Sequence, residues 1–220
     1  MEVFAFAYDR MNEDYKLVIV VHLLEMTVYR LGSNLWENIP VTNPYWIPKG
    51  KSGVLVKGDL HWLASGNNGF CIVSLDMSNE KFEEIQLSED CFLNGPYFSL
   101  GMLRECLSLL VEVDKGQVEV LVMQEYGVRQ SWARRYIITH EIILRTISAN
   151  SSQWNSLKIM WTFKNGEILF VGSDNLVYYD PKHGSVVERN LNGLTCSRNL
   201  SYVESLISPN SGTYLGREHM

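Results

Sequence analysis

A pattern of strand, polar turn, large apolar residue, charged residues and strand recurs four times along this chain, the fourth time weakly. We call the large apolar positions the anchors. They are Trp36, Phe82, Trp132 and Val187, which lie 46, 50 and 55 residues apart. A period of roughly 40–50 residues with several strands in each unit is typical of β-propellers, whose blades are four-stranded sheets.

Short runs rich in β-branched and aromatic residues alternate with turns rich in glycine, asparagine and aspartate, as hairpins require. The predicted strands include 16–22, 53–57, 60–64, 70–75, 107–113, 118–123, 136–138, 168–171 and 176–179. We therefore predict an all-β propeller of four-stranded blades, with a generic β-sandwich as the alternative. Each anchoring tryptophan or phenylalanine is expected to pack between neighbouring blades, where its burial contributes ~2–3 kcal/mol.

The chain has 220 residues, a net charge of −6 and a pI near 5.4. This acidity argues against nucleic acid as the main partner, because phosphate binding normally needs a basic face. The longest apolar run, 17–24, is too short to span a membrane. The four cysteines are scattered and are expected to be free thiols in a reducing compartment, the cytoplasm or the nucleus.

Acidic residues and histidines that could take part in catalysis are present, but they do not have the spacing that catalysis needs. Asp9, Glu13 and Asp14 are interpreted as solvated acids of a turn, where Asp9 and Asp14 bond turn amides, in preference to an acid–base pair. His61 alternates with apolar residues and is expected to be a buried or half-buried structural histidine, in preference to a base or a ligand. We predict that the protein is not an enzyme and that it has no catalytic residue, no cofactor and no metal site.

Two proline-containing loops carry adjacent aromatic or amide side chains, and aromatic residues on rigid loops are common hot spots of protein recognition. They predict a partner-binding site made of Tyr45, Trp46, Asn94 and Tyr97. The alternative for Trp46 is that it fills the space between two blades. The cluster of Arg129, Arg134 and Arg135 is interpreted as a solvated strand face, with an acidic-partner patch as the alternative.

Several segments, in this order, resemble the F-box-associated domain of plant F-box proteins, a group that includes the S-locus F-box and kelch-like proteins. They are 6–9, 12–18, the "VYRLGSNLWENIP" of 28–40, 58–64, 72–76, 122–128, 166–169, 176–181 and 202–206. This resemblance covers roughly residues 5–209 and implies a kelch-like propeller over 1–210, followed by a flexible tail over 211–220.

The resemblance further implies a protein partner, namely a substrate that an SCF-type ubiquitin ligase modifies. Family members recruit the ligase through an F-box and early propeller strands that precede the matching segments, and this chain shows neither, so we expect a propeller that is incomplete at its N-terminus. The SCF ligase would then be reached only through an F-box that is not in this chain. The alternative is a stand-alone scaffold, or a truncated family copy, without ligase recruitment.

Overall fold

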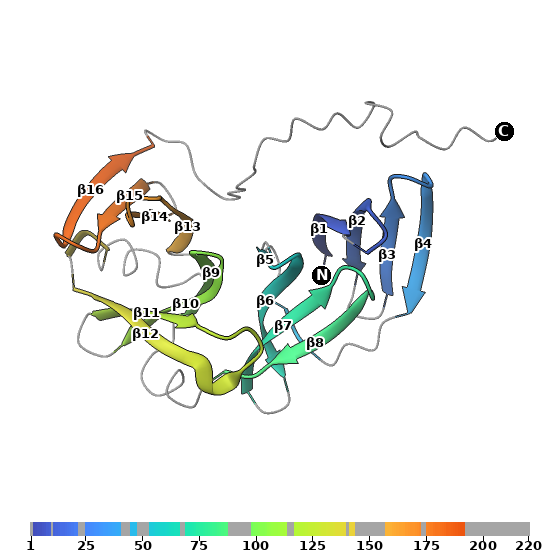
Figure 1. Cartoon of the computed structure of the whole chain (residues 1–220), viewed down its shortest axis with the longest axis horizontal. Helices are drawn as coiled ribbons and strands as arrows, with labels where there is room; N and C mark the ends of the chain where they lie inside the picture. Colours follow the sequence, from blue (N-terminus) through green and yellow to red (C-terminus); the bar gives the residue numbers. More distant parts are fainter. Residues whose placement is uncertain are drawn as a thin grey trace.

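The computed structural model describes residues 2–9, 11–21, 25–40, 45–47, 53–66, 69–87, 98–113, 117–139, 141–143, 157–172 and 175–191. Within these ranges lie four antiparallel four-stranded sheets, each built from strands that are consecutive in the sequence. We call the sheets blades 1 to 4. Figure 1 shows them side by side around an arc.

The first strand of each blade, β1, β5, β9 or β13, lies on the concave side of this arc, and the last strand, β4, β8, β12 or β16, lies on its outer side (Figure 1). Blades 1 and 2 comprise β1 (Glu2–Asp9), β2 (Asp14–Val21), β3 (Glu25–Arg30), β4 (Leu35–Pro40), β5 (Val54–Val56), β6 (Asp59–Gly66), β7 (Gly69–Asp76) and β8 (Lys81–Ile85). Blades 3 and 4 comprise β9 (Phe98–Leu103), β10 (Cys106–Val113), β11 (Gln117–Met123), the 3-10 turn η2 (Arg129–Ser131), β12 (Trp132–Ile138), β13 (Lys158–Thr162), β14 (Ile168–Val171), β15 (Asn175–Asp180) and β16 (Ser185–Asn190).

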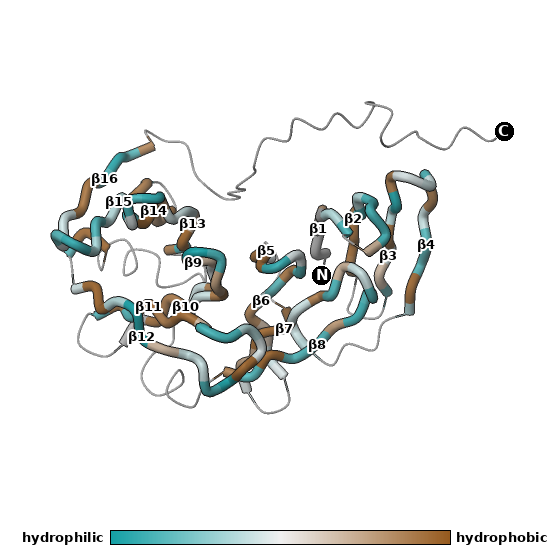
Figure 2. Tube along the Cα trace, viewed as in Figure 1, coloured by the Kyte–Doolittle hydropathy of each residue, from teal (hydrophilic) through white to brown (hydrophobic). Residues whose placement is uncertain are grey.

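All nine predicted strands are present, so the all-β prediction and the four-stranded unit are confirmed. Figure 2 shows why the strands could be predicted from the sequence: the hairpin turns are mostly hydrophilic, and the hydrophobic stretches lie within the strands. Because side chains alternate between the two faces of a strand, each blade can present apolar residues to both neighbours.

Each pair of neighbouring blades encloses its own hydrophobic core. Blades 1 and 2 bury one core around Met26 and Trp62. Blades 2 and 3 bury a second around Ile72 and Leu109, and blades 3 and 4 a third around Phe170. A single twisted sheet cannot cover its own apolar faces, so stacking the blades around an arc is what removes these side chains from water.

Two of the three aromatic anchors follow the prediction. Phe82 packs on the core between blades 1 and 2, and Trp132 packs on the core between blades 2 and 3. Each of these anchors therefore faces the blade that precedes its own. This part of the prediction is confirmed.

For Trp36, the third aromatic anchor, the prediction was wrong. Trp36 is 56% exposed, because it pairs with Tyr29 on the face of blade 1 that points away from blade 2, where no other described blade packs. Val187 is 55% exposed, because Val186 is the residue that pairs with the buried Tyr179 and faces blade 3. A shift of one residue moves a strand side chain to the opposite face.

Candidate partner-binding site

Trp46 is the best-defined residue of the predicted binding site. Its backbone N–H donates to the carbonyl of Ser65 at 2.8 Å, and the N–H of Ser65 donates back to the carbonyl of Trp46 at 2.9 Å. The segment is therefore fixed to the end of β6. The next residue, Ile47, is fully buried in the core between blades 1 and 2, whereas the Trp46 side chain is 54% exposed. The alternative that Trp46 fills the space between blades is wrong.

Tyr45, on the other side of Trp46, is half-buried against the same core. A hydrogen bond with Glu84, burial and the negative charge of Glu84 together raise the pKa of Tyr45 to about 12. Its ring also lies close to Gly66, where a Cβ atom would be 3.2 Å from the ring. Tyr45 and Ile47 thus hold the backbone while Trp46 between them is presented to solvent.

The remaining two predicted residues, Asn94 and Tyr97, lie outside the described residues, as does the predicted tail over 211–220. Two of the three clustered arginines lie on an exposed strand face, that of β12, as predicted, whereas Arg129 lies in the turn η2 and does not. Arg134 and Arg135 are exposed, and Arg134 pairs with Glu119 at 2.8 Å. Arg129 is half-buried and its Nε donates to the carbonyl of Leu87 at 3.0 Å.

An exposed aromatic face on blade 1 was not singled out from the sequence. Phe6 stacks on Tyr15 with a centroid separation of 5.3 Å, and Tyr8 meets the same ring edge-on at 5.0 Å. Tyr29 and Trp36 form a further pair at 4.9 Å. The alternation of aromatic residues along β1 was the available signal, and its meaning depended on knowing which face of blade 1 is covered.

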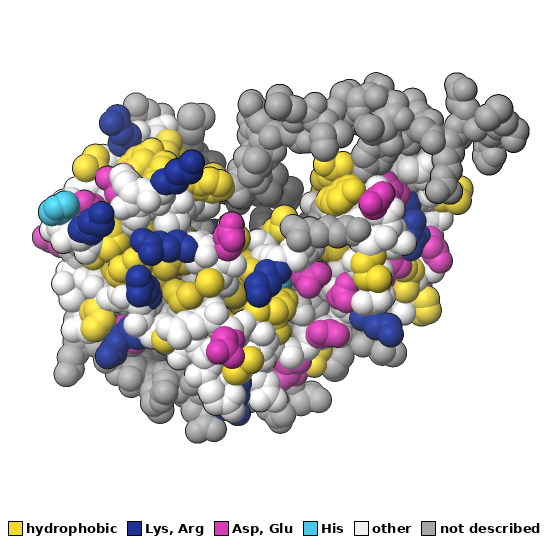
Figure 3. Space-filling view, viewed as in Figure 1, with side chains coloured by type: hydrophobic (Ala, Val, Ile, Leu, Met, Phe, Trp, Pro, Cys, Tyr) yellow, Lys and Arg dark blue, Asp and Glu magenta, His cyan; other side chains and the backbone are white. Residues whose placement is uncertain are grey.

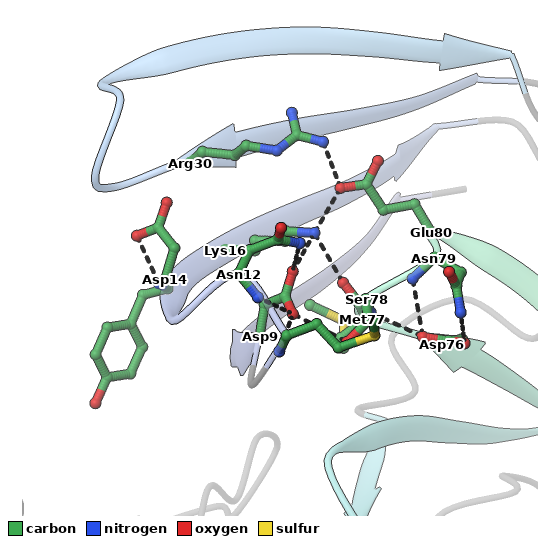
Figure 4. Close-up of polar contacts among 12 residues, drawn as sticks. Asp9, Asn12, Asp14, Lys16, Arg30, Asp76, Met77, Ser78, Asn79 and Glu80 are labelled. Carbon is green, nitrogen blue, oxygen red and sulfur yellow. Dashed lines mark hydrogen bonds and ion pairs between the residues drawn. The ribbon is translucent and has the colours of Figure 1, made fainter.

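Of the three acids of the first hairpin, Asp9 corrects the prediction, whereas Glu13 is exposed as predicted. Asp9 is fully buried, not solvated, and its carboxylate lies 2.6 Å from the ammonium of the buried Lys16 (Figure 4). Burial by itself raises the pKa of Asp9, but hydrogen bonds from Asn12, Lys16 and Ser78 outweigh it and hold that pKa well below its usual range. The predicted bonds to turn amides are confirmed, since Asp9 accepts from the N–H groups of Met11 and Asn12.

The same cluster joins two blades. The Lys16 ammonium donates to the carbonyl of Met77 at 2.9 Å and to Glu80 at 2.7 Å, and both acceptors lie in the β7–β8 hairpin of blade 2. Arg30 reaches Glu80 as well (Figure 4). The buried charge of Lys16 is thus fully hydrogen-bonded, as a charge inside a protein must be. The cluster therefore acts as a structural clamp.

His61 is fully buried, as predicted, at the contact of blades 2 and 3. Its Nδ1 lies 3.2 Å from the carbonyl of Val54 and its Nε2 lies 2.7 Å from the hydroxyl of Tyr126. Because a carbonyl only accepts, Nδ1 carries the proton and Nε2 accepts from Tyr126. Burial lowers the pKa of His61 and keeps the ring neutral.

This lowered pKa predicts a pH-dependent stability. The unfolded chain binds a proton at His61 near pH 6.5 and the folded chain only at lower pH, so the stabilisation is complete above pH 6.5 and is lost as the pH falls below it. We expect the free energy of unfolding to fall by up to about 1.4 kcal/mol per pH unit in this range. Denaturant melts at pH 7.5 and 5.5 would measure it, and His61→Gln should lack this loss. An equal loss in both proteins would contradict the assignment.

Within the described ranges, no group of three or more His, Cys, Asp and Glu side chains could hold a metal ion. Cys71 is a buried free thiol, and burial together with the charge of Glu84 raises its pKa to about 11. Cys106 is free and half-buried, while Cys91 and Cys196 lie outside the described residues. No helix in the described part of the chain is long and apolar enough to cross a membrane.

Four four-stranded sheets, stacked face to face around an arc, place the chain among the β-propeller proteins. Within that class, the chain belongs to the family of F-box associated beta propeller domains, whose model matches residues 1–209. The family resemblance seen in the sequence is thereby confirmed.

Similar proteins come from Arabidopsis thaliana. The F-box/kelch-repeat protein At3g23880 is 27% identical over 94% of this chain and 56% of its own length. The F-box protein At3g07870 is 27% identical over 87% of this chain and 55% of its own length. The chain thus spans about half the length of these relatives. Among solved structures, YCF48 from Cyanidioschyzon merolae has a TM-score of 0.44 at 14% identity, covering 86% of this chain and 56% of that protein.

Proposed function

We propose that this domain is the substrate-recognition part of an F-box protein and that it holds a protein target while an SCF-type ligase transfers ubiquitin to it. The observation that carries the proposal is the family match over residues 1–209, together with relatives that are named as F-box proteins. The mechanism is positioning, so no covalent chemistry is required of this chain. Such a receptor would work in the cytoplasm or the nucleus.

We further propose that Trp46 is a principal contact of the target, and that Tyr45, Asn94 and Tyr97 are further contacts. A tryptophan that is exposed on a hydrogen-bonded backbone loses little conformational entropy when a partner covers it. This property makes Trp46 suited to recognition of a protein surface.

The test joins this chain to an F-box segment that binds the Skp-type adaptor and expresses the fusion in plant cells. We expect one or more proteins to fall in abundance, to recover when the proteasome is inhibited, and to bind the purified chain directly. If proteins bind the chain but none is depleted, the scaffold alternative takes the place of the ligase role. If no protein does either, the receptor function is wrong.

For a target found in this way, Trp46→Ala is expected to weaken binding by about thirtyfold, the effect of a 2 kcal/mol hot spot. Titration calorimetry with the purified target measures this change. Trp161→Ala is the matched control, because Trp161 is also an exposed tryptophan, 40% accessible, but lies on β13 of blade 4. Equal affinities for wild type and Trp46→Ala would remove Trp46 from the site.

A further inference from the structure

In blades 2, 3 and 4, the hairpin on the concave side of the arc carries a cation. Lys57 is in the two-residue turn between β5 and β6, and Arg104 is in the two-residue turn between β9 and β10. Lys164 lies in the turn between β13 and β14. All three side chains are exposed. We call these three residues the inner rim.

Two of these cations occupy backbone conformations that disfavour them. Lys57 has φ 56° and Arg104 has φ 49°, and Arg104 is followed by Glu105 at φ 65°. A two-residue hairpin with positive φ at both positions is normally made of asparagine and glycine. Blade 2 keeps a glycine at its second position, Gly58, whereas blade 3 has none. Residues held in such conformations tend to cluster at functional sites.

Side chains of the inner rim reach from one blade to the next. The Arg104 guanidinium of blade 3 lies over Gly166 in the blade 4 turn that carries Lys164, and a Cβ atom on Gly166 would be 3.1 Å from it. The Lys57 ammonium of blade 2 lies 5.2 Å from the ring centre of Tyr126 in blade 3. Strand β9 also contacts both β5 and β13, so the three hairpins are neighbours.

The positive charge of the inner rim is only partly compensated. Neither Arg104 nor Lys164 forms an ion pair with another described residue. The acidic residues nearest in sequence to the three cations are the exposed Glu105 and the half-buried Asp59 and Glu167. Burial raises the pKa of Asp59. On the face in Figure 3, Lys and Arg side chains gather over blades 3 and 4, and Asp and Glu over blades 1 and 2.

We propose that Lys57, Arg104 and Lys164 dock an acidic segment of the protein target at the concave side of the propeller. An extended chain with carboxylates or phosphoserines can follow neighbouring hairpins and place one negative group at each cation. The acids over blades 1 and 2 repel such a segment beyond Lys57 and so direct it toward Arg104 and Lys164 on blades 3 and 4. This inference rests on the proposed function and names the chemistry of its target.

The test measures fluorescence anisotropy of labelled peptides on the purified chain. The probe alternates glutamate with glycine and serine; a second carries phosphoserines instead of glutamates, and a third carries glutamines. We expect the two acidic peptides to bind, with affinity falling between 50 and 200 mM NaCl as exposed charge pairs require. Comparing their affinities shows whether carboxylates or phosphates are preferred. Absence of binding by both acidic peptides, or equal binding of the glutamine peptide, overturns the proposal.

A triple variant, Lys57→Gln, Arg104→Gln and Lys164→Gln, is expected to bind the better acidic peptide at least about tenfold more weakly, since each exposed pair contributes several-fold. The matched control removes three exposed cations from the outer side of the arc, Lys81→Gln, Lys182→Gln and Arg189→Gln. Net charge is the same in both variants, so an equal loss in both would mean non-specific attraction and would overturn the proposal. If a single-stranded oligonucleotide bound as tightly as the acidic peptide, or more tightly, the proposal would also be overturned.

A charge-neutral variant separates function from folding. Arg104→Asn with Glu105→Gly leaves the net charge unchanged and installs the preferred hairpin residues. We expect a Tm at least as high as that of the wild type together with weaker peptide binding. Unchanged binding would exclude Arg104 from the site. Failure of the rim variants to weaken binding of a target would reject the inner rim alone, because the receptor role is tested separately by target depletion and by Trp46→Ala.

Discussion

Replacing Lys16 with methionine is expected to lower the free energy of unfolding by about 3–5 kcal/mol, the usual cost of removing one partner from a buried ion pair. The substitution leaves the Asp9 carboxylate buried without its counter-charge, and leaves the Met77 carbonyl without the ammonium that it accepts from. Urea denaturation followed by circular dichroism would measure the change.

The double variant Asp9→Asn with Lys16→Met is the control, because it removes both charges and keeps a side chain that can accept from the turn amides. We expect it to be more stable than Lys16→Met alone, so that the two single effects do not add. If the double variant were less stable than the wild type by the sum of the two single effects, the ion pair would not be the reason for the loss.

Trp62→Ala is expected to be about as damaging, with a loss of about 3–5 kcal/mol. Trp62 is a fully buried side chain at the centre of the core between blades 1 and 2. Gly53 packs directly on its indole, where a Cβ atom would be only 2.8 Å from the ring. The backbone there is shaped around the tryptophan, so the alanine variant leaves a large cavity that the neighbours cannot close.

Trp62→Phe provides the comparison for that prediction. The indole Nε1 of Trp62 is buried with no hydrogen-bond partner among the described residues, so phenylalanine removes no hydrogen bond seen there and keeps most of the apolar volume. We expect a loss of less than about 1.5 kcal/mol for this variant. Similar losses for alanine and phenylalanine would show that packing volume is not what Trp62 supplies.

The strands and their grouping into blades could be predicted because alternation and turn residues are local properties of the chain. The strand predicted over 168–171 has the same bounds as β14 in the structure. Burial of His61 also followed from its apolar neighbours, which share its strand. The exposure of Trp46 was one of two alternatives, and only the pairing with Ser65 decided between them.

Properties that depend on a distant partner could not be predicted. Asp9 was expected in solvent because the sequence does not show that the β7–β8 hairpin closes over it. Trp36 has the sequence pattern of an interior anchor, yet whether it is covered depends on a neighbouring sheet. The turn at Arg104 and Glu105 was not recognised because neither residue is typical of a tight hairpin.

Every hydrophobic core described above is shared by two blades that are adjacent in the sequence. The energetics of the domain therefore resemble those of a row of coupled units, in which each blade exchanges free energy only with its neighbours. Damage to the first interface, as in Trp62→Ala, leaves the interface around Phe170 untouched. Amides of β14 and β15 should then remain protected from hydrogen exchange while those of β2 and β3 open, so that unfolding proceeds along the arc from one end instead of in a single step.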